Sequence, residues 1–74
     1  MRRASRVRVH ALMIAARQQP DDADSLLRQA LRLAQRAMAR DGKDHDAIRC
    51  LGMLWWRLGA RQRGRELLGL GRRS

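Results

Sequence analysis

Apolar residues recur at intervals of three and four along most of the chain, and this spacing is typical of amphipathic helices. The clearest stripe lies between Asp24 and Asp41 and consists of Leu27, Ala30, Leu31, Ala34 and Met38, widened by Leu26, Leu33 and Ala37. Acidic residues precede this stripe, where the N-terminus of a helix favours negative charge. Asp41-Gly42 follows it and is typical of a left-handed helix terminus. We therefore predict one long helix over this segment.

The segment before the long helix predicts a less regular first helix. Ser5 can cap a helix that runs from Arg6 to Gln19 and ends before Pro20, because residues that precede proline avoid helical dihedral angles. Its apolar stripe is expected at Val7, Ala11, Ile14 and Ala15. The alternation of arginine and valine over residues 6–9 also fits a short extended arm, so the sequence leaves two interpretations of this start.

Two more helices are expected in the second half of the chain. The third begins at Asp44 or Asp46 and ends or kinks at Gly59. One of its faces is apolar and carries Ala47, Ile48, Leu51, Leu54, Trp55 and Leu58. The fourth spans about residues 60–70, and its inward positions are Ala60, Gly64, Leu67 and Leu68. Its glycines make this helix weak unless another surface supports it.

These segments together predict an all-α fold of four short helices in antiparallel hairpins. A length of 74 residues allows one small domain, residues 1–74, in which residues 1–5 and 72–74 are expected to be frayed basic tails. The core is marginal, because a chain of this size buries only about 60% of the surface that it exposes when unfolded. Trp55 and Trp56 are the only aromatic residues, so the core must be mostly aliphatic.

The third and fourth helices carry a pattern that is more specific than amphipathicity. It reads Ile48-x-x-Leu51-Gly52-x-x-Trp55 and continues, nine residues after the tryptophan, with Gly64-x-x-x-Leu68. This pattern resembles the tetratricopeptide repeat, a 34-residue helix–turn–helix unit. The resemblance covers about residues 28–71, since three alanines fit the second helix of a preceding repeat: Ala30, Ala34 and Ala37. Gly42 takes the place of the closing proline of that family, and Pro20 breaks the register upstream.

The resemblance implies one set of residues for packing and another for binding. In the packing set, two glycines let the helices of the last hairpin cross closely while larger side chains fill the space around the crossing: Leu51, Gly52, Trp55, Gly64 and Leu68. The binding set lies on the other face of the third helix, which in such repeats lines a concave groove for a peptide or a helix: Arg49, Met53, Trp56 and Arg57. Alternatively, Trp56 packs against the first helix.

The character of the binding set indicates the kind of partner. A flexible methionine, a large indole and two guanidinium groups suit an amphipathic helix with acidic flanks. Stable arrays of such repeats usually contain three or more of them, so a repeat and a half is expected to associate with a partner protein or with a second copy of the chain. We therefore expect a small adaptor or chaperone.

A second, shorter resemblance narrows this expectation. Residues 54–59 and 67–71 are similar to the C-terminal helices of small tetratricopeptide-like chaperones of bacterial type III secretion. Those chaperones hold needle or export subunits. The resemblance therefore implies a secretion-system subunit as the partner.

The charge of the chain supports an alternative function. The sequence has 17 basic and 7 acidic residues, for a net charge of +10, and both ends are more basic than the middle. Such a field attracts polyanions, and arginines at every fourth position could contact a nucleic-acid backbone: Arg28, Arg32, Arg36 and Arg40. Sequence-specific reading of DNA is not expected, because the candidate recognition helix over residues 47–58 is mostly apolar. The arginine excess is also what a GC-rich genome produces.

Other classes of function find little support. The chain lacks a glycine-rich phosphate loop, a Gly-x-Ser-x-Gly elbow and a metal-spaced group of Cys and His, so we expect no enzyme activity, no cofactor and no metal. Asp44-His45-Asp46 is better explained as a helix cap than as a site. Cys50 is the single cysteine and lies in an apolar run, which predicts a buried, inert thiol and a cytoplasmic location. The longest apolar stretch, residues 11–16, is too short to span a membrane.

Overall fold

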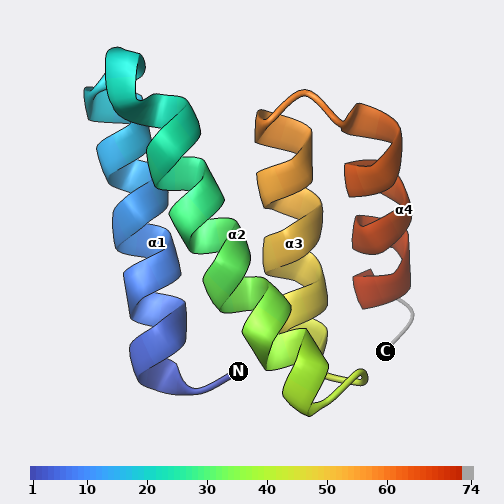
Figure 1. Ribbon diagram of the computed structural model, residues 1–74. Coiled ribbons are helices and arrows are strands. Elements are labelled where there is room, and N and C mark those ends of the chain that lie inside the picture. Colours follow the sequence, from blue (N-terminus) through green and yellow to red (C-terminus); the bar gives the residue numbers. More distant parts are fainter. Residues whose placement is uncertain (73–74) are drawn as a thin grey trace.

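The protein is all-α, as the apolar pattern predicts, and its four helices alternate in direction along the chain (Figure 1). The computed structural model describes residues 1–72. Each helix packs against the next one in the sequence, so that α2 and α3 occupy the middle. No helix in this range is long and apolar enough to cross a membrane. The elements are α1 (Arg3–Gln18), the 3-10 turn η1 (Pro20–Asp22), α2 (Ala23–Arg40), α3 (His45–Arg57) and α4 (Arg61–Arg72).

The start of α1 differs from the prediction. The helix begins at Arg3, and no side chain caps its N-terminus, so Ser5 lies within the helix and is not its cap. Residues 6–9 are helical, which excludes the extended arm. Residues 3–5, expected as part of a frayed tail, also belong to α1, and the Arg6 amide donates to the Arg2 carbonyl over 3.0 Å. Of the expected tail at the other end, residues 73–74 lie outside the described residues.

The buried face of α1 is not the stripe that its sequence suggests. Its buried residues are Val9, Met13 and Ala16. Val7 and Ile14, which belong to the predicted stripe, are instead 59% and 57% exposed. The apolar residues of α1 occur on most of its sides, so its own sequence does not select one face for burial. Packing against α2 and α3 makes that choice.

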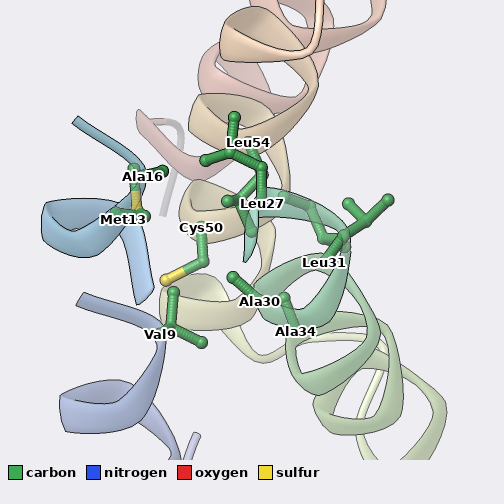
Figure 2. Packing of buried hydrophobic residues seen from close by; sticks show 10 residues of the cluster. Val9, Met13, Ala16, Leu27, Ala30, Leu31, Ala34, Cys50 and Leu54 are labelled. Atoms are coloured by element: carbon green, nitrogen blue, oxygen red, sulfur yellow. The ribbon is translucent and has the colours of Figure 1, made fainter. Parts of the chain in front are cut away.

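The core joins the first three helices (Figure 2). The predicted stripe of α2 is correct in outline, although Leu26, Leu33 and Met38 are only partly buried. Leu54 of α3 is fully buried and is the largest side chain that has no exposure. The main core cluster consists of Val9, Met13, Ala16, Leu27, Ala30, Leu31, Ala34, Cys50, Leu51 and Leu54. Alanine is frequent in this set, which lets the helices approach one another closely.

Cys50 is buried among these side chains, as the sequence predicts. Burial raises the pKa of the Cys50 thiol, and the nearby carboxylates of Asp46 and Asp44 raise it further. The thiolate form, which is the reactive one, is therefore disfavoured in the folded protein.

The turns at the two ends of α3 are built differently. At its start, the carboxylate of Asp44 caps the helix by accepting the Ala47 amide over 3.1 Å. In the preceding turn, Gly42 does not take the left-handed conformation that we predicted, and the Asp41 side chain accepts the Lys43 amide over 2.9 Å. Because this side-chain bond closes the turn, a left-handed residue is not needed. At the other end of α3, Gly59 has a φ of 98° and terminates the helix, as expected.

The carboxylate of Asp44 also forms an ion pair with the ammonium group of Met1. Partial burial of the Asp44 carboxylate by itself would raise its pKa. The hydrogen bonds from Met1 and from the Ala47 amide, together with the positive charge of the ammonium group, outweigh this effect, so the pKa of Asp44 lies below its ordinary value. The charged form of Asp44 is therefore more stable in the folded chain than in the unfolded chain.

We expect Asp44→Asn to remove a pH-dependent contribution to stability while keeping the helix cap, because asparagine caps helices as well as aspartate does. Since the folded-state pKa is the lower one, this contribution is present above about pH 4 and is lost as the pH falls further. The free energy of unfolding of the wild type should therefore exceed that of Asp44→Asn at neutral pH, and the two should converge in acid. Asp44→Ala, which also removes the cap, should lose about 1 kcal/mol more. Urea titrations across pH would measure both effects, and parallel pH curves for wild type and Asp44→Asn would contradict the assignment.

α3 and α4 cross where two glycines face each other. A Cβ atom added at Gly52 would lie 2.9 Å from the Gly64 carbonyl oxygen and 2.8 Å from Cγ of Leu68. A Cβ atom added at Gly64 would lie 2.6 Å from the Gly52 carbonyl oxygen. Both glycines are buried. The missing side chains therefore set how closely the two helices approach.

Candidate partner-binding groove

A groove with a volume of about 570 Å³ opens between α1, α3 and α4. Its size lies within the range of about 300–1,000 Å³ that is usual for binding clefts. Helices that are distant in the sequence form its walls, since α1 provides one side and α4 the other. The residues that line it are Met13, Arg17, Met53, Trp56, Arg57, Arg65, Leu68 and Gly69.

The floor of the groove is apolar. Met13 is buried at its α1 side, and Leu68 is partly buried at its α4 side. Between them, Met53 and Trp56 of α3 are each 40% exposed, so part of each side chain remains open to a ligand. A hollow of about 150 Å³ extends this surface along α1 and α3 past Ile14 to His10, and Met13, Ile14 and Met53 form its apolar part. An elongated apolar strip of this kind suits the apolar face of a helix.

Arg57 connects the groove to α1. Its Nη1 atom donates a hydrogen bond to the carbonyl oxygen of Met13 over 3.1 Å. This carbonyl belongs to a residue near the middle of α1, so the bond fixes the position of α3 relative to α1. Because only one of the guanidinium nitrogens is used, Arg57 retains donors for a second acceptor in the groove.

Two arginines of α4 hold the indole of Trp56. The guanidinium carbons of Arg61 and Arg65 lie 5.9 Å and 5.8 Å from the centroid of the Trp56 ring. Such cation–π contacts attract the charge to the face of the ring. The arginines are four residues apart and therefore lie on the same side of α4. The indole is thereby kept in the groove instead of turning freely in solvent.

The rim of the groove is cationic. Arg17, Arg57 and Arg65 come from three different helices and all line the same hollow. None of the lining residues that the structure describes is acidic. The combination of an apolar floor and a positive rim therefore complements an apolar ligand that carries negative charge along its edges.

The structure places three of the four predicted binding residues together. Met53, Trp56 and Arg57 line the groove, whereas Arg49 is exposed on α3 but does not line it. Trp56 faces α1 across the groove and still keeps 40% of its surface exposed. Four lining residues were absent from both predicted sets because they lie on the helices that form the walls: Met13, Arg17, Arg65 and Gly69. Leu68 was predicted for packing. It packs at the crossing of α3 and α4 and also lines the groove.

Among the other predicted packing residues, Leu51 is buried in the core and Trp55 is partly buried. The guanidinium carbon of Arg63 lies 4.9 Å from the centroid of the Trp55 ring, so this indole is covered by α4. The two adjacent tryptophans therefore differ in role. Trp55 belongs to the α3–α4 contact, and Trp56 faces the groove.

The two carboxylates of Asp44-His45-Asp46, at the start of α3, have structural roles. Asp44 caps the helix, and Asp46 forms an ion pair with Arg6 over 3.4 Å. Within residues 1–72, no group of three or more Cys, His, Asp or Glu is arranged to hold a metal ion. The carboxylates of this triplet therefore serve to fix α3 against the beginning of α1.

The arginine stripe of α2 is exposed along its whole length, as its spacing predicts. Its first member, Arg28, is neutralised by an ion pair with Asp24 over 2.9 Å. Among the described side chains, Arg32, Arg36 and Arg40 have no carboxylate within ion-pair distance. These three arginines therefore form the part of the stripe that can attract a polyanion.

Comparisons of the chain with known protein families, with curated proteins and with solved structures found no match. The resemblances to tetratricopeptide repeats and to secretion chaperones therefore stay predictions that rest on the sequence pattern.

Proposed function

We propose that this protein is a non-enzymatic interaction module that binds an amphipathic helix of a partner protein in the groove between α1, α3 and α4. The observation that carries the proposal is the apolar floor of Met53 and Trp56 inside a rim of arginines from three helices. Such a site offers dispersion and hydrophobic contacts at its centre and electrostatic selection at its edge. It fits a helix with an apolar stripe and acidic flanks.

The size and shape of the molecule support an adaptor or chaperone. With extents of 34 × 27 × 16 Å, the protein is only slightly longer than a helix of about 20 residues. It can therefore shield one helix of a partner and little more. The single buried cysteine suits a cytoplasmic location, and the resemblance to type III secretion chaperones makes a needle or export subunit the first natural partner to test.

The proposal can be tested with two designed helical peptides. Both carry leucines at positions i, i+3, i+4 and i+7, and they differ only in whether glutamate or lysine flanks the apolar stripe. The glutamate peptide should bind, and the lysine peptide should bind at least about tenfold more weakly because of the cationic rim. Isothermal titration calorimetry measures both affinities. Equal binding of the two peptides, or binding of neither, would contradict the proposal.

Trp56→Ala should weaken binding of the glutamate peptide by about 30-fold, because a central indole in a desolvated groove contributes about 2 kcal/mol or more. Circular dichroism should show unchanged helix content, since Trp56 is 40% exposed. Leu70→Ala is the matched control, because Leu70 is a large apolar residue of α4 that is 53% exposed and does not line the groove. If Trp56→Ala lost its helices, the indole would be a core residue. If Leu70→Ala weakened binding equally, the peptide would not lie in the groove.

A further inference from the structure

A second surface lies on the opposite side of α1 from the groove. A hollow of about 140 Å³ between α1 and α2 is lined by Arg8, Leu12, Gln29, Arg32, Leu33 and Arg36. Arg8 and Arg17 are nine residues apart, which places them on opposite sides of α1 at about 100° per residue. Since Arg17 lines the groove and Arg8 lines this hollow, the two surfaces face away from each other.

This hollow continues into a larger one towards the start of the chain. The larger hollow has a volume of about 370 Å³ and shares Leu33 and Arg36 with the first. Its lining also includes Arg2, which precedes α1, and Arg40, which ends α2. We call the resulting surface the arginine face, and its arginines are Arg2, Arg8, Arg32, Arg36 and Arg40.

The arginine face keeps an excess of positive charge. None of its five arginines forms an ion pair in the part of the chain that the structure describes. Two carboxylates line the larger hollow. The ammonium group of Met1 offsets the charge of Asp44, whereas Asp41 accepts only the uncharged Lys43 amide. The charge of Asp41 therefore offsets one of the three arginines of this hollow, and two remain in excess. Only arginine and Gln29 offer polar side chains around the smaller hollow, which therefore favours an anion.

The chemistry of this surface distinguishes among polyanions. A guanidinium group binds phosphate through two parallel hydrogen bonds, so converging arginines suit phosphate groups in particular. None of the large exposed apolar side chains lines either hollow, so the surface offers nothing to insert into a bilayer. No aromatic side chain on which an unpaired base could stack lines either hollow. A nucleic-acid duplex, whose phosphates lie outside, fits these conditions best.

We propose that the arginine face binds the phosphate backbone of a nucleic-acid duplex without reading its sequence. The stripe that the sequence suggested thus changes its membership, because Arg28 is paired with Asp24, while Arg2, which precedes α1, and Arg8 of α1 join it. Arg36 lines both hollows, and Arg32 lies one helical turn away from it in the smaller one. The inference is independent of the proposed function, since the groove and the arginine face share no residue.

The test compares two double variants that remove the same charge. Arg32→Gln/Arg36→Gln alters the arginine face, and Arg17→Gln/Arg65→Gln alters the groove. All four side chains are exposed, so both variants should keep the helix content of the wild type. Binding is measured by fluorescence anisotropy with labelled duplexes of DNA and of RNA of about 20 base pairs, which exceed the 34 Å length of the protein at about 3.4 Å per base pair. Vesicles that contain phosphatidylserine provide the membrane arm.

The expected results are specific to the arginine face. Wild-type affinity for a duplex should fall steeply between about 50 mM and about 200 mM salt and should not depend on base sequence. Arg32→Gln/Arg36→Gln should reduce the slope of log K against log salt by about 2 and weaken binding by at least about tenfold, and the groove variant should remain close to wild type. In the same samples, the glutamate peptide should bind normally to the Arg32→Gln/Arg36→Gln variant.

Three outcomes would overturn the inference. Equal losses in the two double variants would mean that net charge alone attracts the duplex. Unchanged duplex binding by Arg32→Gln/Arg36→Gln would place the contact elsewhere. Binding to the vesicles without binding to either duplex would assign the surface to a membrane.

Discussion

Leu54→Ala is expected to destabilise the protein by about 2–5 kcal/mol, the cost of removing a fully buried leucine side chain and leaving a cavity. Leu54 has no exposed surface and packs in the core that joins the first three helices. At about 0.05–0.15 kcal/mol per residue, a chain of 74 residues has a total stability of only about 4–11 kcal/mol. This single substitution should therefore remove a large part of the stability and lower the melting temperature by roughly 10 °C or more.

Two measurements check this expectation. Thermal and urea unfolding, followed by circular dichroism, give the loss of free energy. The rate at which a thiol reagent labels Cys50 gives an independent value, because Cys50 is buried in the same cluster and becomes accessible only when the core opens. Leu70→Ala makes the same chemical change at a residue that is 53% exposed and should change stability by less than about 0.5 kcal/mol. Equal losses for the two variants would show that Leu54 is not a core residue.

Gly64→Ala is expected to force α4 away from α3. The new Cβ atom would lie 2.6 Å from the Gly52 carbonyl oxygen and 2.9 Å from the Trp56 amide nitrogen. Both are backbone atoms, so only a shift of a whole helix can relieve the overlap. Overpacking of this kind costs about 1–3 kcal/mol. Since α4 carries Arg65 and Leu68, the same variant should also weaken binding of the glutamate peptide.

Gly69→Ala is the matched control for the loss of stability. It makes the same substitution in the same helix, but no atom lies within 4 Å of the added Cβ. Both variants gain the higher helix propensity of alanine, about 1 kcal/mol. The difference between their free energies of unfolding therefore isolates the cost of the crossing, and we expect it to be about 1–3 kcal/mol. If Gly64→Ala were as stable as Gly69→Ala, α3 and α4 would not cross at this position.

The predictions succeeded best for helices that have one clear apolar face. α2 and α3 have strongly one-sided sequences, and their buried residues were identified almost completely. For α1 the prediction was wrong, because apolar side chains occur on most of its sides and the exposed Val7 and Ile14 looked as suitable for the core as Val9 did. In the turn before α3, Gly42 led us to predict a left-handed residue, but that turn is closed by a hydrogen bond from the Lys43 amide to the Asp41 carboxylate.

The sequence predicted only those binding residues of the groove that belong to α3, the helix that carries the repeat-like pattern. That pattern pointed to Met53, Trp56 and Arg57, which are close in the sequence and share one face of α3. Met13 and Arg65 belong to other helices, and no regularity in the sequence relates them to α3. The arginine face was predicted in part for the same reason, since the spacing within α2 revealed Arg36 but not its neighbour Arg8 on α1.

The sequence by itself determined the local properties of this protein: four helices, an aliphatic core, a buried thiol and a strong positive charge. These follow from periodicity and composition, which act over a few residues. Only the tertiary structure decided which side of α1 is buried, that Met13 and Trp56 line one groove, and that Arg8 and Arg36 line one hollow. The physical reason is that contacts between helices depend on how complete side-chain surfaces fit together, and such fits join residues that are distant in the chain.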